Sequence, residues 1–121
     1  MLINIRPGGI RELHWHPNAS EWQYYIAGKA RMTVFTNEGA RTMDFNANDV
    51  GFVPRVAGHY IENMGDTDVQ VLEVFATGEF QEISLNNWMR RLPQEMVTAH
   101  LNLDVESIRK IPAEVSDILP P

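Results

Sequence analysis

A single change of pattern near residue 84 constrains the fold of this chain more than any other feature. Before it, short runs rich in β-branched and aromatic residues alternate with Gly, Pro and Asn turn signals at intervals of about ten residues, which is typical of an all-β sandwich or barrel. After it, Leu85, Trp88, Met89 and Leu92 follow the helical period and lie on one face of a helix. The pattern therefore predicts a β-barrel followed by short helices.

The turn signals divide the β-rich part into predicted strands, and the apolar periodicity divides the remainder into predicted helices. The strands are expected at residues 3–6, 10–16, 21–27, 31–35, 41–45, 50–53, 60–63 and 69–75. The helices are expected at residues 85–92, 93–101, 105–110 and 113–119, with Ser84 as the N-cap of the first and Pro93 in the first turn of the second. Residues 1–83 then form the barrel, and residues 84–121 form a helical extension that packs on it or on a neighbouring subunit, within one domain overall.

Composition and charge exclude several classes of function. The 121 residues include no cysteine, so disulfides, cysteine-ligated zinc, iron–sulfur clusters and thiol nucleophiles are ruled out. Ten Lys and Arg residues against sixteen Asp and Glu residues give a net charge of −6 without a basic run, which argues against binding to nucleic acid or to an anionic membrane. The first residues contain no long apolar stretch, so we expect neither a signal peptide nor a transmembrane span, and a cytoplasmic location.

Three histidines and one glutamate in the β-rich part are the strongest candidates for chemistry. His14 and His16 are two residues apart on one predicted strand, so both imidazoles point to the same face. A turn over residues 17–20 brings Glu21 back beside them, and His59 opens a later strand. Three imidazoles and one carboxylate suit a divalent first-row metal, and on an octahedral ion such as manganese or iron they leave about two positions open for water or substrate. The donor set alone does not separate manganese from iron, zinc, nickel or copper.

The spacing of these residues within two motifs is more specific than the residues themselves. The pattern G-x5-H-x-H-x4-E-x6-G runs from Gly8 to Gly28, and P-x3-G-H-x3-N runs from Pro54 to Asn63. These segments resemble the two signature motifs of the cupin superfamily. The longer strings at residues 11–18, 21–25, 51–54, 58–60, 84–88 and 100–103 are similar to the oxalate decarboxylase family, which consists mostly of bicupins. The similarity is greatest to the second, C-terminal cupin of that family and covers nearly the whole chain.

This resemblance implies a jelly-roll or double-stranded β-helix barrel that holds manganese through His14, His16, Glu21 and His59. The family cleaves the carbon–carbon bond of oxalate to carbon dioxide and formate, and it requires dioxygen. The resemblance therefore favours a manganese-dependent enzyme that acts on a small carboxylate.

The resemblance also implies roles for two further residues. Arg11 matches an arginine that binds and polarises the substrate, and its guanidinium fork suits a carboxylate. By strict alternation Arg11 points away from the face of His14, so it reaches the metal only if the strand twists or bulges after Gly8-Gly9. Glu73 matches a buried carboxylate considered as a proton donor, a role that requires a raised pKa in an apolar environment.

The chain departs from the family in ways that keep other interpretations open. It contains one cupin, and it lacks upstream strands that usually complete the barrel. We therefore expect either a fragment or a chain that borrows a strand from a partner. A homodimer would cover the open edge of the sheet. The Ser-Glu-Asn-Ser/Thr lid, which carries the proton donor of the family's N-terminal site, is absent. The alternatives are an oxalate oxidase or other metal dioxygenase, which differs in proton delivery, and a non-catalytic metal- or carboxylate-binding cupin or isolated bicupin half.

Overall fold

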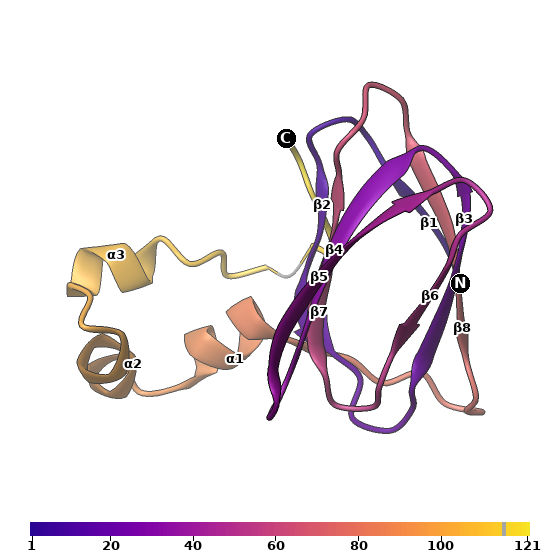
Figure 1. Ribbon diagram of the computed structural model, residues 1–121. Coiled ribbons are helices and arrows are strands. Elements are labelled where there is room, and N and C mark those ends of the chain that lie inside the picture. The colour runs from indigo at the N-terminus through magenta and orange to yellow at the C-terminus, as the bar shows by residue number, and fades with distance from the viewer. Residues whose placement is uncertain (115) are drawn as a thin grey trace.

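Two antiparallel sheets face each other and form a flattened barrel in the computed structural model, which describes residues 1–114 and 116–121 (Figure 1). The four-stranded sheet has the order β1-β8-β3-β6, and the other has the order β10-β2-β7-β4-β5, with β9 also paired to β2. The elements are β1 (Leu2–Ile5), β2 (Ile10–Trp15), β3 (Glu21–Ala27), β4 (Lys29–Thr36), β5 (Gly39–Asn46), β6 (Val50–Val53), β7 (Gly58–Asn63), β8 (Val69–Phe75), β9 (Ile83–Ser84), α1 (Leu85–Arg91), α2 (Gln94–Leu101), α3 (Val105–Arg109) and β10 (Ile118–Leu119). The predicted all-β architecture with short C-terminal helices is confirmed.

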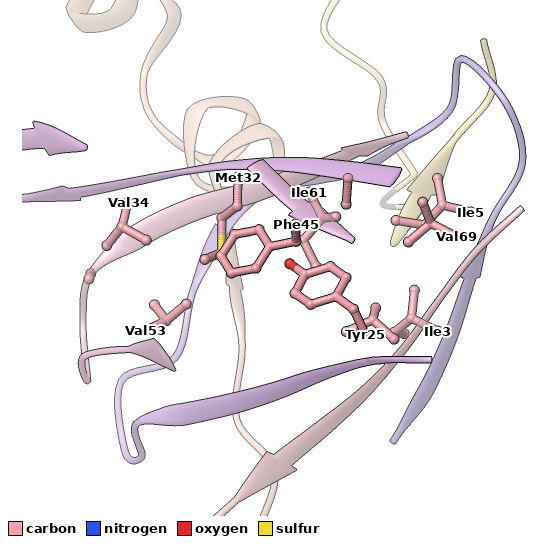
Figure 2. Packing of buried hydrophobic residues seen from close by; sticks show 12 residues of the cluster. Ile3, Ile5, Tyr25, Met32, Val34, Phe45, Val53, Ile61 and Val69 are labelled. Atoms are coloured by element: carbon pink, nitrogen blue, oxygen red, sulfur yellow. The ribbon is translucent and has the colours of Figure 1, made fainter. Parts of the chain in front are cut away.

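The core lies between the two sheets and is built from the inward-facing half of each strand. In β3 and β8, every second residue is buried, as expected where one face of a sheet meets the core. Figure 2 shows these side chains converging from both sheets, with the rings of Tyr25 and Phe45 stacked at a centroid distance of 4.5 Å. The same alternation that fills the core at one end of the barrel directs polar side chains inward at the other end.

Gly28, the last glycine of the first motif, is required by the turn from β3 to β4. Its φ is +87°, and a Cβ built there would lie 2.6 Å from the Asp68 carbonyl oxygen. Replacement by alanine therefore forces both a left-handed backbone and a clash with fixed backbone atoms. We expect Gly28→Ala to lower the free energy of unfolding by about 1–3 kcal/mol, measured by urea denaturation. Gly78→Ala is the matched control, because Gly78 has open space and no positive φ; an equal loss in both variants would contradict the explanation.

Helices α1 and α3 begin at the predicted residues, whereas α2 begins at Gln94, with Pro93 as its N-cap instead of in its first turn. The Ser84 side chain accepts a hydrogen bond from the Asn87 backbone N–H and caps α1, which confirms the predicted N-cap. The Trp88 ring packs edge-on against Trp15 of β2 at a centroid distance of 5.8 Å, so α1 lies beside the barrel. Figure 1 shows α2 and α3 projecting away from the two sheets. No helix within the described part of the chain has the length and apolar character needed to cross a membrane.

The helix predicted at residues 113–119 is wrong for the described part of that range. Ile118 and Leu119 form β10, which pairs with Arg11 and Ile10 of β2, and Val115 lies outside the described residues. The seven residues between Pro112 and Pro120 could form only a short helix, which is marginally stable, whereas the edge of β2 offers unpaired backbone groups. Because β9 and β10 both pair with β2, residues beyond 83 also contribute strands to the barrel. The division of the chain at residue 84 stays a prediction.

Candidate metal centre

Three strands bring the four predicted ligands together at one end of the barrel interior. His14 lies on β2 and His16 directly follows it, Glu21 opens β3, and His59 is the second residue of β7. All four are buried, and His14 pairs with His59 across the sheet. One ligand atom from each residue lies within 4.8 Å of the ligand atoms of the other three. The geometry therefore assembles residues that are separated by up to 45 positions in the sequence (59 − 14).

Backbone carbonyls set the orientation of all three imidazoles. His14 Nδ1 lies 2.7 Å from the Glu12 carbonyl oxygen, His16 Nδ1 2.9 Å from that of Gln81, and His59 Nδ1 3.0 Å from that of Ala57. A carbonyl oxygen only accepts, so each Nδ1 must carry the proton and donate it. Nε2 is then the ring nitrogen that faces the centre in each case. This is the arrangement that fixes histidine tautomers in metal sites.

Glu21 is oriented by two residues on its own strand. Gln23 Nε2 donates to Glu21 Oε1 at 2.7 Å, and the Tyr25 hydroxyl donates to Gln23 Oε1 at 2.7 Å. The second oxygen, Oε2, then faces His16 Nε2 at 3.1 Å and His59 Nε2 at 3.0 Å. Because Glu21, Gln23 and Tyr25 alternate along β3, all three side chains point into the barrel.

The electrostatics of the cluster fit a divalent cation. Burial alone would raise the pKa of Glu21, but hydrogen bonds from His16 and His59 outweigh it and hold that pKa well below its usual range. Burial, followed by the neighbouring His59, lowers the pKa of His14 to about 2, so its ring is neutral. His14 Nε2 is buried without a hydrogen-bond partner. A carboxylate held ionised beside a neutral ring with an unused nitrogen is a donor set that a metal ion would complete.

A β-bulge brings Arg11 into the same interior as His14. Arg11 pairs with Ile61 and His14 pairs with His59, so β2 advances by three residues while β7 advances by two. The extra residue reverses the alternation, and both Arg11 and His14 become buried on the inner face. The guanidinium donates through Nη2 to Glu82, and through Nη1 to the Asp117 carbonyl oxygen at 3.5 Å. The bulge that Arg11 needs in order to face the interior is therefore present. The role of Arg11 toward a substrate stays a prediction.

Glu73 is a buried carboxyl group without a hydrogen bond. It lies on β8 opposite Gln23 of β3, and neither of its carboxyl oxygens has a partner. Burial, reinforced by the negative charge of Glu21 and opposed by Arg11, raises the pKa of Glu73 to about 8. The group is therefore protonated at neutral pH and can hold a proton beside the predicted metal centre.

Comparison with known proteins places this barrel in a family. The family model described as cupin matches residues 1–109. The chain belongs to the cupin family. This cupin is 54% identical over 103 residues to oxalate decarboxylase OxdC of Bacillus subtilis (strain 168), an alignment that covers 84% of the chain and 27% of OxdC. It is 42% identical over 115 residues to a probable oxalate decarboxylase of Arthroderma benhamiae, covering 93% of the chain and 28% of that protein.

Solved structures agree with the sequence relatives. A structure of the Bacillus subtilis oxalate decarboxylase, described as having Mn(II) centres, superposes with a TM-score of 0.96 at 46% identity, over 99% of this cupin and 32% of that chain. This confirms the predicted cupin fold and the resemblance to oxalate decarboxylases. The chain spans less than a third of the length of these relatives.

Titration of Glu73 should make the stability of the metal-free cupin depend on pH. The folded protein keeps the Glu73 proton up to about pH 8, whereas the unfolded chain releases it near the ordinary value of 4.5. The folded state thus binds more protons across this interval, and stability falls as pH rises, by about 1.4 kcal/mol per pH unit. Glu73→Gln should remove this contribution, so the variant gains stability relative to the wild type between about pH 5 and about pH 9 in urea denaturation.

The control for this measurement is Glu79→Gln, which changes an exposed glutamate in the segment that follows β8. Its stability relative to the wild type should stay constant with pH. A parallel pH dependence of the wild type and Glu73→Gln would show that Glu73 keeps an ordinary pKa.

Sequence reasoning missed Glu82 and Glu12 as parts of the site. Glu82 pairs with Arg11, and buried Glu12 accepts a hydrogen bond from the Ser84 hydroxyl at 2.8 Å. Neither contact has a signal in the sequence, because the partners are about 70 positions apart and belong to no shared motif. Gln23, by contrast, is expected on the face of Glu21 from the sequence, because it lies two residues away on an alternating strand.

Proposed function

We propose that this cupin binds Mn²⁺ through His14, His16, Glu21 and His59 and converts oxalate to carbon dioxide and formate. The observation that carries the proposal is the convergence of three fixed imidazole nitrogens and one carboxylate beside a buried arginine and a protonated carboxyl group. The named activity of the relatives supports the choice of oxalate, and the Mn(II) centres of the Bacillus subtilis enzyme support the choice of metal.

The residues of the chain supply binding and proton delivery. A bound divalent ion would supply Lewis-acid polarisation of a substrate carboxylate. Arg11 would hold the carboxylate through two parallel hydrogen bonds. When the carbon–carbon bond breaks, one carbon leaves as carbon dioxide and its bonding electron pair stays on the other carbon. That carbon then accepts one proton, which Glu73 holds at neutral pH, and formate is the product.

The test is product analysis on the manganese-loaded protein with oxalate in the presence and absence of dioxygen. Formate, detected by proton NMR and formed only with dioxygen, would support the proposal. Hydrogen peroxide in place of formate would identify an oxalate oxidase instead. Binding of oxalate without either product would identify a carboxylate-binding cupin without catalysis. The cytoplasmic location stays a prediction.

We also propose a homodimer as the functional form. The outer face of the four-stranded sheet exposes apolar side chains on all four strands, at Leu2, Trp22, Tyr24, Ile26, Val50, Phe52, Leu72 and Val74. A contiguous apolar face of this kind marks an association surface on a soluble protein. Sedimentation velocity should show a particle of twice the mass of the chain, and Trp22→Glu should convert it to monomer. A monomeric wild type at micromolar concentration would refute the dimer.

A further inference from the structure

The segment between β8 and β9, residues 76–82, lies against the metal centre. The Gln81 carbonyl oxygen accepts a hydrogen bond from His16 Nδ1 at 2.9 Å, and the Phe80 ring lies 5.4 Å from the His16 ring between centroids. At the end of the segment the Glu82 side chain turns inward to Arg11, and 13% of it stays exposed. The segment thereby introduces a carboxylate into the site that no motif predicted.

We propose that Glu82 occupies, in the resting protein, the position on Arg11 that a substrate carboxylate takes when it binds, and that binding displaces it. This inference rests on the proposed function, because it assumes that Arg11 receives a carboxylate. It adds an internal competitor that sets the affinity of the site for carboxylates.

One oxygen of Glu82 lies near both Arg11 and the metal-directed nitrogen of His14. Glu82 Oε2 accepts a hydrogen bond from Arg11 Nη2, and the same oxygen lies 3.8 Å from His14 Nε2. His14 Nε2 has no other polar partner. A substrate carboxylate that binds the guanidinium beside a metal ion held by His14 would need the space that this oxygen fills, so it and Glu82 exclude each other.

The contact with Glu82 leaves the guanidinium incompletely satisfied. Glu82 engages Nη2 alone, Nη1 reaches a backbone carbonyl only at 3.5 Å, and Nε of Arg11 is buried without a partner. A free carboxylate can instead form two parallel hydrogen bonds with a guanidinium. Arg11 therefore has more hydrogen-bonding capacity than Glu82 uses, and a ligand that uses more of it can replace Glu82.

Burial explains why a replaceable partner is needed at all. Arg11 is completely buried, and a buried charge without a counterion is strongly destabilising. Glu82 supplies that counterion when no ligand is present. Its own segment has no regular secondary structure, and the Glu82 side chain is already partly exposed, so the released carboxylate can turn out to solvent. The apparent affinity for a carboxylate is then lowered, because only the fraction of protein in which Arg11 is free of Glu82 can bind.

The experiment measures carboxylate binding rather than turnover. Manganese-loaded wild type, Glu82→Ala and Glu82→Gln, each with its metal content determined first, are titrated calorimetrically with formate, and with oxalate under nitrogen. We expect both anions to bind Glu82→Ala at least about tenfold more tightly than the wild type. The gain in affinity should be smaller for Glu82→Gln, because the amide keeps an oxygen acceptor for Arg11. The same acceptor makes Glu82→Gln the variant less prone to misfolding. The gain should vanish in the Arg11→Lys background.

Glu79→Gln is the matched control, because it removes the same charge from an exposed position of the same segment. It should bind both anions as the wild type does. Unchanged or weaker binding by both Glu82 variants would overturn the inference and leave the proposed function standing, since Glu82 would then be a permanent partner of Arg11. If neither anion binds to the wild type or to any variant, carboxylate binding itself is refuted and the inference falls with it.

Discussion

Replacing His16 with alanine is expected to abolish binding of the divalent metal. His16 is buried, its Nδ1 is held by the Gln81 carbonyl, and its Nε2 faces the Glu21 carboxylate at 3.1 Å. Loss of a residue that only orients a ligand typically weakens metal affinity about 10- to 100-fold, so loss of a ligand itself should exceed about 100-fold. Elemental mass spectrometry of protein from manganese-supplemented cells should find about one ion per wild-type chain and none in the variant.

His100→Ala is the control, because it also removes an imidazole but from an exposed position on α2. It should keep the metal content of the wild type. Metal-free wild-type protein, or equal metal in the wild type and His16→Ala, would show that the four residues form a degenerate site. The enzymatic proposal would then be abandoned.

Replacing Arg11 with lysine is expected to reduce kcat/KM for oxalate by about 100-fold or more while the metal content stays unchanged. Lysine keeps the positive charge but loses the planar fork, so it cannot form two parallel bonds with a carboxylate. It also cannot reach the Glu82 and Asp117 acceptors with separate nitrogens, as the guanidinium does. The substitution therefore separates the geometric contribution of Arg11 from its charge.

Formate release is the readout, with metal content measured on the same samples. A variant that retains wild-type turnover would show that charge alone suffices at this position. A variant that loses metal together with activity would place Arg11 in the structural support of the centre instead. Arg31→Lys is a suitable control, because Arg31 pairs with Asp44 on the outside of the barrel.

Local sequence patterns were sufficient to predict β1 to β8 and to select the four candidate ligands, but they did not predict β9 and β10. Side chains two residues apart on a strand share a face, so His14 and His16 had to point the same way. The glycines of the first motif carry comparable information: Gly28 permits the turn between β3 and β4, and it lies against the backbone of Asp68 and Val69. These inferences hold because strand alternation and turn conformation depend mainly on neighbouring residues.

The same local reasoning failed at the C-terminal segment. Residues 113–119 have an apolar pattern compatible with a helical turn, yet Ile118 and Leu119 pair with β2. The preference of a short segment is weak, and the free edge of a distant strand offers backbone hydrogen bonds that a short helix cannot match. The competing partner is more than 100 positions away, as the pairing of Ile118 with Arg11 shows (118 − 11 = 107).

The sequence by itself determined which residue types stand on which strand face, and hence the barrel, its core and the candidate metal donors. Only the tertiary structure decided that a bulge turns Arg11 inward, that Glu82 meets it, and that Glu73 is left without a partner. The physical reason is that alternation is a property of one strand, whereas a bulge, an ion pair and the desolvation of a carboxyl group depend on several chain segments meeting in space. The chemistry that the site can perform depends on this second set of features.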